Sequence, residues 1–340
     1  MKPLLNTLYV TQPESLLLKE GETVLVRKGE EKLIQVPIHT LSQIICFGIT
    51  IYVSPPLMAL CSERGVSITW LTESGRFLAR LEGRITGYVL LRRTPHRWGD
   101  SAERALAVAR NIVAAKINNS RINLLRRLRG GGSDALLQEQ IDHLAALLPR
   151  VAACSDLEVL RGLEGEAANG YFSVFDRLIV QQKDAFIFAG RNRRPPLDPV
   201  NALLSFVYTL LALDIQSALE TVGLDPFIGF LHADRPGRPG LALDLMEEFR
   251  APLADRLVLN LINLKQVDAR DFRREGVEVR MTDDCRKRVI TAYQNRKKEM
   301  IVHPFLEERM EIGVLFHAQA QLLARHIRGD LDYYPAILWR

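Results

Sequence analysis

The sequence predicts an α+β protein, in which a small N-terminal β-domain (residues 1–95) is followed by a larger all-α C-terminal domain (residues 96–340). Two observations support this prediction. Before residue 95, short runs of β-branched and aromatic residues alternate with turn signals, whereas after it apolar residues recur at helical spacing. The length of 340 residues is enough for two domains with separate cores.

The first domain is predicted from strand-like runs that glycine and proline separate. The expected strands are Leu4–Val10, Leu16–Lys19, Thr23–Arg27, Glu31–Val36, Ile44–Phe47, Ile49–Val53, Ser67–Leu71, Phe77–Leu81 and Val89–Leu91. A single short helix is expected at Pro56–Arg64, because it begins at a proline pair.

The second domain is predicted to begin with a long basic helix. Ser101 caps this helix, Ala102–Leu128, and the three glycines at 130–132 end it. Further helices are expected at Ser133–Leu148, Asp156–Phe186, Pro199–Thr221, Leu241–Asn263, Asp283–Glu299 and Pro304–Arg328. Between them, Ala189–Pro196 is expected to be a basic loop, and Val267–Val279 to contain a hairpin or turn around Gly276.

The composition is that of a soluble globular protein. A net charge of +5 is only weak evidence for an anionic partner. The four cysteines are scattered without a CxxC pair, which argues against zinc ribbons and disulfide frameworks. There is no secretory signal, and the apolar stretch Ala202–Ala218 carries Ser205 and Asp214, so it fits a buried helix better than a membrane span. We therefore expect a reduced, cytoplasmic protein.

Chemically distinctive residues gather between positions 229 and 250. His232 precedes a basic, turn-rich segment, after which Asp244, Glu247 and Glu248 stand at i, i+3 and i+4 and would share one face of a helix. Carboxylates among apolar residues need a positive partner, which could be a divalent metal or the neighbouring arginines. The imidazole favours a metal, and the predominance of oxygen ligands favours magnesium or manganese over zinc.

A third ligand is expected from elsewhere in the chain. Glu164 is the best candidate, because the small residues Gly165, Ala167 and Ala168 beside it permit close approach of backbone or DNA. A purely structural role remains open for each acid and for His232, since ion-paired helix faces and core histidines are common. The residues alone leave the metal site and the structural role evenly balanced.

Arginines around this cluster are candidates for phosphate contacts, because guanidinium matches phosphate oxygens in pairs. They are Arg193, Arg194, Arg235, Arg238 and Arg250. The basic residues between Arg270 and Lys298 alternate with acids, so we expect a solvated helix face there instead.

Three motifs resemble those of the CRISPR-associated adaptation integrase family, the universal spacer-acquisition endonuclease. They are LEGEAANGYF at Leu163–Phe172, RRPPLDPVNALLS at Arg193–Ser205, and GFLH at Gly229–His232 with LDLMEEFR at Leu243–Arg250. The match runs in order over essentially the whole chain, and the ending Tyr333–Trp339 resembles the type I-C branch. Two departures, Asn169-Gly170 and the charged Glu166, do not touch the ligand positions.

The resemblance implies a metal-dependent DNA endonuclease and integrase. Its catalytic Mg²⁺ or Mn²⁺ ligands would be Glu164, His232 and Glu247, with Asp244 and Glu248 beside them. The 3′-hydroxyl of a prespacer would attack a phosphodiester of the double-stranded CRISPR leader-repeat. The resemblance also implies a homodimer formed through the β-domain, and a heterohexamer with a small ferredoxin-like adaptation protein. The alternatives are a non-enzymatic double-stranded DNA-binding scaffold and a general metal nuclease.

Overall fold

The computed structural model describes residues 6–72, 77–83, 89–130, 133–192 and 195–339. The chain forms two compact units, Met1–Thr86 and Gly87–Arg340. Their boundary falls after Thr86 and not near residue 95, because α2 (Val89–Gly99) belongs to the second unit. The strand expected at Val89–Leu91 is therefore wrong. Leu91, Pro95 and Trp98 are buried at helical spacing, which fixes this segment as an amphipathic helix.

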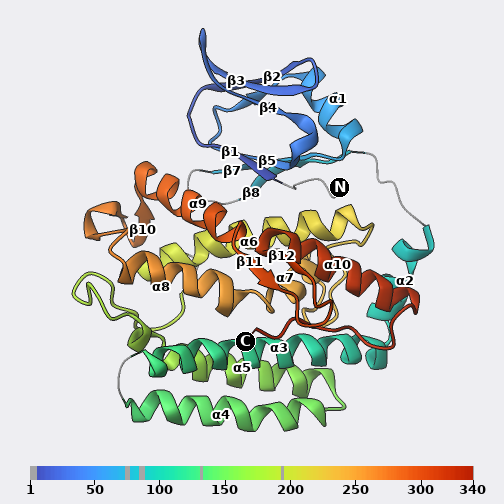
Figure 1. The fold of residues 1–340 in the computed structure, drawn as a ribbon, viewed down its shortest axis with the longest axis vertical. Helices are drawn as coiled ribbons and strands as arrows, with labels where there is room; N and C mark the ends of the chain where they lie inside the picture. Colours follow the sequence, from blue (N-terminus) through green and yellow to red (C-terminus); the bar gives the residue numbers. More distant parts are fainter. Residues whose placement is uncertain (1–5, 73–76, 84–88, 131–132, 193–194, 340) are drawn as a thin grey trace. The chain divides into compact units, whose positions relative to one another are not determined.

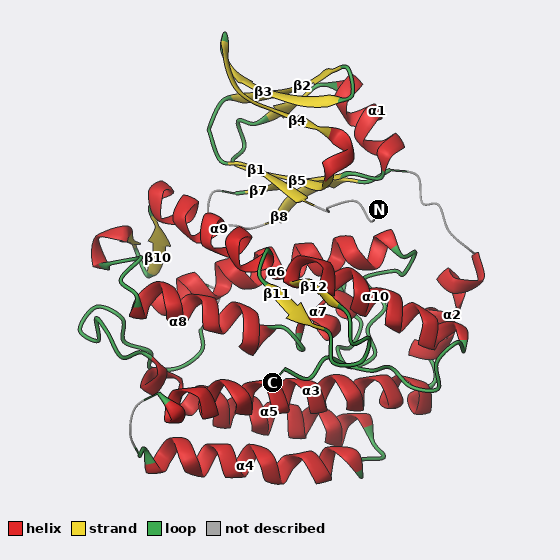
Figure 2. Ribbon diagram, in the orientation of Figure 1, coloured by secondary structure: helices red, strands yellow, loops and turns green. Residues whose placement is uncertain are grey.

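The N-terminal unit contains two four-stranded sheets (Figure 1; Figure 2). In one sheet the order is β1-β5-β7-β8, from the strands Asn6–Val10, Leu41–Phe47, Ser67–Leu71 and Phe77–Leu81. In the other it is β4-β3-β2-β6, from Glu31–Pro37, Thr23–Lys28, Ser15–Glu20 and Tyr52–Val53. Both sheets and α1 (Pro55–Arg64) contribute to one core, in which Leu17, Ile44, Leu57 and Ile68 are fully buried. The predicted β-domain is confirmed.

The C-terminal unit is largely helical, as expected. After α2 come α3 (Ala102–Arg129), α4 (Ala135–Ala152), α5 (Leu157–Ser173), α6 (Pro199–Thr221), α7 (Gly240–Met246), α8 (Arg256–Asn263), α9 (Asp283–Lys297) and α10 (Ile312–Arg328). Helix α3 packs against α4 and α5, and these three run side by side in Figure 1. Ser101 caps α3 by accepting a hydrogen bond from the backbone of Arg104, as its position predicted.

Two small hairpins interrupt the helices. The pair β9 (Phe272–Glu275) and β10 (Glu278–Met281) turns at Gly276, as expected. The second pair, β11 (Met300–Val302) and β12 (Arg309–Glu311), replaces the first turns of the helix predicted from Pro304. The helix expected over Asp156–Phe186 was also too long. It ends at Ser173, and the chain then folds back so that the rings of Phe172, Phe175 and Phe188 pack together.

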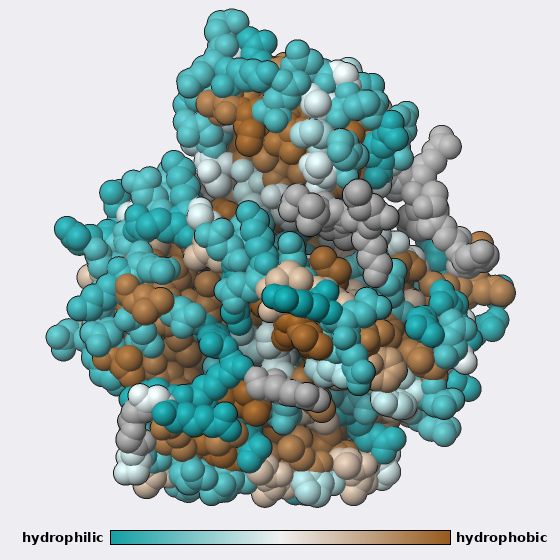
Figure 3. All heavy atoms as spheres, in the orientation of Figure 1, coloured by the Kyte–Doolittle hydropathy of each residue, from teal (hydrophilic) through white to brown (hydrophobic). Residues whose placement is uncertain are grey.

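The apolar helix α6 is long enough to cross a membrane, but 72% of its apolar window is buried within the protein. Its one buried acid, Asp214, accepts hydrogen bonds from Tyr293 (2.7 Å) and Lys297 (2.8 Å). A helix packed in this way is a core element, as the sequence predicted. The four cysteines are all buried and free. On the surface, hydrophilic residues cover most of the face in Figure 3, and hydrophobic residues gather in separate patches.

Candidate active site

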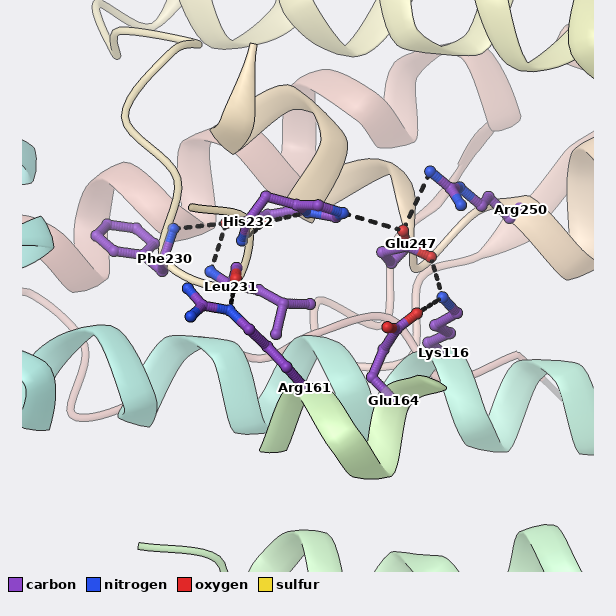
Figure 4. Close-up of polar contacts among 9 residues, drawn as sticks. Lys116, Arg161, Glu164, Phe230, Leu231, His232, Glu247 and Arg250 are labelled. Atoms are coloured by element: carbon purple, nitrogen blue, oxygen red, sulfur yellow. Dashed lines mark hydrogen bonds and ion pairs between the residues drawn. The ribbon is translucent and has the colours of Figure 1, made fainter. Parts of the chain in front are cut away.

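Four segments of the C-terminal unit meet at the predicted acidic cluster (Figure 4). Helix α3 carries Lys116 and α5 carries Glu164, while the loop before α7 carries His232 and the turn after α7 carries Glu247. The structure therefore brings His232 beside Glu247 and links Glu164 to Glu247 through Lys116. It also adds Lys116, which lies in the predicted basic helix but was not a candidate site residue.

Asp244 orients His232. The Asp244 carboxylate is fully buried and accepts hydrogen bonds from the backbone N–H groups of Phe230 (2.6 Å), Leu231 (2.9 Å) and His232 (3.0 Å). Its Oδ1 also lies 2.6 Å from His232 Nδ1. Because a carboxylate can only accept, the neutral form of the ring carries its proton on Nδ1 and keeps the lone pair on Nε2. A carboxylate behind a histidine in this way is a common support for metal ligands.

The loop that carries His232 is held by close backbone contacts and one arginine. A side chain at Gly229 would come within 2.6 Å of the His232 carbonyl, and one at Gly240 within 3.0 Å of the Gly229 backbone. Only glycine allows the loop and the start of α7 to approach this closely. From α5, Arg161 Nε donates to the Leu231 carbonyl at 2.6 Å, which ties the loop to the helix that carries Glu164.

Glu247 faces three positively charged or polar groups. Its Oε1 lies 3.1 Å from Arg250 and 3.9 Å from His232 Nε2, and its Oε2 lies 2.7 Å from Lys116 Nζ. Burial opposes ionisation of this side chain, but Arg250, Lys116 and His232 outweigh that effect and lower its pKa to about 2. Glu247 is therefore ionised at neutral pH, which is the state that a metal ligand needs.

Glu164 is joined to this group through Lys116, whose ammonium is hydrogen-bonded to it. A side chain at Gly165 would meet nothing within 4 Å, so no protein backbone approaches closely there, and the expected approach of DNA stays a prediction. Its neighbour Glu166 pairs instead with Arg150 (3.1 Å) and His143 (3.5 Å) on α4. Within residues 157–173, Glu164 thus supplies the acid that reaches the cluster.

The carboxylates of Glu164 and Glu247 and the imidazole of His232 are suitable ligand types for a divalent metal, but they do not surround one position. In the described part of the chain, no three His, Cys, Asp or Glu side chains are close enough to hold an ion. The Lys116 ammonium instead contacts both glutamates. An ammonium between two carboxylates marks a place where a cation is favoured. The 3.9 Å gap between His232 Nε2 and Glu247 Oε1 is also short enough for two ligands of one ion at about 2.1 Å each. Glu164, His232 and Glu247 would hold such an ion.

Glu248 does not share a face with Asp244 and Glu247, so that expectation is wrong. Helix α7 ends at Met246, and Glu248 accepts from Tyr334 (2.5 Å), Gln319 (2.8 Å) and the backbone of Ile337 (2.7 Å). Burial raises its pKa to about 7, although these three hydrogen bonds act in the other direction. Glu248 anchors the C-terminal tail beside the cluster and contacts none of the predicted ligands.

The single helix expected over Leu241–Asn263 is also broken by a π-helix, Arg250–Asp255. Pro252 has no N–H to donate to the Glu248 carbonyl, one helical turn earlier. That carbonyl instead accepts from Asn119 of α3 at 2.8 Å. Asn119 also donates to the Ile337 carbonyl (3.0 Å) and accepts from the Trp339 N–H (3.0 Å), so it links α3, the turn before the π-helix and the tail. π-Helical segments occur frequently at functional sites.

The predicted phosphate-binding arginines lie in different environments. Arg235 is exposed and Arg238 is half-buried in the loop before α7. Arg250 is held between Glu247 and the ring of Tyr208, 5.1 Å from the ring centroid. Arg193 and Arg194 lie outside the described residues. The C-terminal basic residues pair with nearby acids, as expected; examples are Arg288–Asp271, Arg280–Glu278 and Arg296–Glu299.

Sequence reasoning missed a buried acid behind the site. Asp255 accepts from Tyr208 (2.5 Å) and Tyr171 (3.0 Å), and Asn123 donates to Tyr171 at 2.8 Å. Both tyrosine hydroxyls are therefore engaged within the helical unit. Lys116 was missed as well, although it stands between the buried residues Ala115 and Ile117 in a helix. A charge flanked by core residues was the available signal.

Fold and site together define a class of protein: a β-rich unit followed by a helical unit that carries a carboxylate–histidine centre. The family model for CRISPR associated protein Cas1 matches residues 8–295. A Chlorobaculum tepidum protein named CRISPR-associated endonuclease Cas1 1 is 52% identical over 100% of both chains. A Rhodospirillum rubrum protein named CRISPR-associated endonuclease Cas1 2 is 49% identical, again over 100% of both. The chain belongs to the Cas1 family.

Solved structures agree with the fold. A CAS1 protein from Thermotoga maritima matches with a TM-score of 0.82 and 22% identity, over 96% of this chain and 97% of that one. A casposase bound to integration product matches with a TM-score of 0.84 and 18% identity, over 99% and 95% of the two chains. A chain of a Cas6-RT-Cas1–Cas2 complex matches with a TM-score of 0.84 and 24% identity, over all of this chain and 36% of that one.

Proposed function

We propose that this Cas1-family protein is a metal-dependent DNA endonuclease and integrase that inserts prespacer DNA into a CRISPR array. The observation that carries the proposal is the position of Glu247 between the other two predicted ligands. His232 Nε2 lies 3.9 Å from one of its oxygens, and Lys116 links the other oxygen to Glu164. Asp244 holds the opposite nitrogen of the His232 ring. Two relatives that are 52% and 49% identical over the whole chain are named endonucleases, which supports a reaction at phosphodiester bonds.

Mg²⁺ or Mn²⁺ held by these three residues would stabilise charge on the phosphodiester oxygens during transfer. The residues of the chain prepare that place. Asp244 and Arg161 fix the histidine loop, and the cations around Glu247 keep its carboxylate ionised. In the reaction itself, the 3′-oxygen of the prespacer replaces the 3′-oxygen of the repeat strand at phosphorus. The first oxygen loses a proton and the second gains one, so no covalent enzyme intermediate is needed.

The proposed partners follow from the surfaces and the family. The exposed Arg235 and the half-buried Arg238 lie in the loop next to His232, where DNA phosphate would approach. In the N-terminal unit, Leu16 and Tyr52 are register partners on β2 and β6, and both are substantially exposed (40% and 64%). An apolar pair of this kind suits the proposed homodimer interface. A small ferredoxin-like partner, a heterohexamer, a cytoplasmic location and the type I-C assignment remain parts of the proposal.

A non-enzymatic double-stranded DNA-binding scaffold is the second candidate. One observation favours it: Lys116 and Arg250 already neutralise the carboxylates, as they would in a purely structural cluster. The two functions differ in their need for metal.

A strand-transfer assay tests the proposal. It combines a supercoiled plasmid bearing a leader and repeat, a short duplex with free 3′-hydroxyls, and the small partner protein. Wild type and His232→Ala are compared with manganese and with chelator; His317→Ala, on α10, serves as the control. We expect joined product only with metal, and only from wild type and the control. Joining by His232→Ala would refute the assignment, whereas DNA retention without joining by any protein would favour the scaffold. Degradation that needs neither 3′-hydroxyl nor partner would indicate a general nuclease.

A further inference from the structure

Lys116 is a largely buried cation at the centre of the site. Its side chain is 11% exposed, its ammonium is hydrogen-bonded to Glu164, and its Nζ lies 2.7 Å from Glu247 Oε2. The two acids come from α5 and from the turn after α7, whereas the lysine comes from α3 (Figure 4). Three separate segments therefore meet at one ammonium.

The two carboxylates need this cation to lie together. Glu247 is almost fully buried, and a second carboxylate beside it would be strongly unfavourable without a positive charge. Arg250 contacts the other oxygen of Glu247, at 3.1 Å. Within the described part of the chain, Lys116 is the one cation at ion-pair distance from Glu164. It is therefore the link that holds Glu164 against Glu247.

We propose that Lys116 is a resident counter-ion of the metal site, which assembles the two glutamates before metal binds and which a divalent ion must displace. This inference rests on the proposed function, because it takes Glu164 and Glu247 as ligands. The ion and the ammonium need the same carboxylate oxygens, so they cannot both occupy the position. Metal affinity is then set by a competition that is built into the chain.

The competition couples metal binding to DNA binding. A displaced ammonium remains on its helix, at the end of a flexible four-carbon stem, and needs a new anion. The phosphate of bound DNA supplies one at the same place. DNA therefore makes displacement easier and raises metal affinity, and by linkage the metal raises DNA affinity by the same factor. In this way Lys116 favours a metal centre that is complete only when substrate is present.

Calorimetric titration of the full-length protein with Mn²⁺ tests the inference, with and without a duplex whose ends lack 3′-hydroxyls. Lys116→Met is compared with wild type and with Lys183→Met, a half-exposed lysine on a surface ion pair. Removing the competing cation should tighten Mn²⁺ binding by roughly tenfold or more, since like charges at contact distance repel strongly. The duplex should then improve Mn²⁺ affinity much less in Lys116→Met than in wild type. Without metal, the variant should melt at a lower temperature.

The outcomes separate this inference from the proposed function. Mn²⁺ affinity in Lys116→Met that is equal to or weaker than that of wild type would overturn the displacement of Lys116 by metal and leave the metal site standing. If neither protein binds Mn²⁺, the proposed function fails and the inference fails with it. If Lys116→Met does not fold, the double variant Lys116→Met/Glu164→Gln removes both charges together. It should recover metal-free stability, and failure to do so would contradict the pairing.

Discussion

Replacing Asp244 by asparagine perturbs the site with almost no change of shape. Asp244 Oδ2 accepts from the N–H groups of Phe230 and Leu231, and Oδ1 accepts from the N–H and the Nδ1 of His232. In Asp244→Asn, one of these two oxygens becomes an amide donor. The remaining oxygen will serve Phe230 and Leu231, because backbone N–H groups cannot change their role, whereas an imidazole can.

The cost follows from the groups left without a partner. The backbone N–H of His232 then faces an amide NH₂ in a buried position and has no acceptor. The hydrogen bonds that remain are weaker, because their acceptor is no longer a charged carboxylate. We expect a loss of about 2–4 kcal/mol in the free energy of unfolding. The ring of His232 will accept from the new amide at Nδ1, which moves its proton to Nε2. That nitrogen can no longer bind a metal, so Mn²⁺ affinity should fall by roughly 10–100-fold.

Three measurements check this reasoning: urea unfolding, Mn²⁺ titration, and the ring ¹⁵N chemical shifts of His232, which report the tautomer. Asp234→Asn is the matched control, because it removes an exposed carboxylate from the same loop. The control should leave all three readouts unchanged. An Asp244→Asn variant that keeps wild-type stability and a protonated Nδ1 would refute the orienting role of Asp244.

Two further predictions concern groups behind the site. Tyr334→Phe removes the hydroxyl that donates to Glu248 at 2.5 Å, so it should lower the free energy of unfolding, measured in urea, by about 1–3 kcal/mol. Tyr333→Phe, at an exposed position, should leave it unchanged. Equal stability of the two variants would contradict the anchoring of the tail. Burial raises the pKa of Asp255 from 3.8 to about 6, so the folded state holds this proton more tightly than the unfolded chain, and stability falls as the pH rises from 4 to 7. Asp255→Asn lacks that loss, so its stability relative to wild type should rise by up to about 3 kcal/mol over this range in pH-dependent unfolding; a constant difference would count against it.

Elements with local signals could be predicted from the sequence. Among the described residues of the N-terminal unit, alternation and turn residues located six of the eight strands to within two residues, and the serine cap and apolar spacing located α3. The other two strands begin three residues from the expected position: β5 begins at Leu41 and not at Ile44, and β6 at Tyr52 and not at Ile49. The breaks could not be predicted in the same way. Pro252 is visible in the sequence, but a proline can end, kink or bulge a helix. Here the outcome depends on Asn119, which takes the freed carbonyl of Glu248, 129 residues further along the chain.

The same limit applied to the site. Residue type and motif indicated four site residues, because ionisable side chains are rare among apolar neighbours. They are Glu164, His232, Glu247 and Asp244. Lys116 was hidden, since it looked like one of many cations along α3. Helical periodicity tells which face a residue occupies but not what that face meets. The cluster of acids did require a positive partner, and the arginines and a metal were considered before a lysine.

Glu247 and Glu248 show how neighbouring, identical side chains come to have opposite roles. Both are buried, yet cations lower the pKa of Glu247 to about 2, whereas neutral donors leave that of Glu248 raised to about 7. The first carboxylate is therefore kept charged for a cation, and the second is committed to the tail through Tyr334 and Ile337. Because Glu247 and Glu248 are adjacent, the hydrogen bonds of Glu248 to the tail, to Asn119 of α3 and to Gln319 of α10 also restrain the backbone of Glu247. The described C-terminal residues, up to Trp339, thus support the candidate site through Glu248.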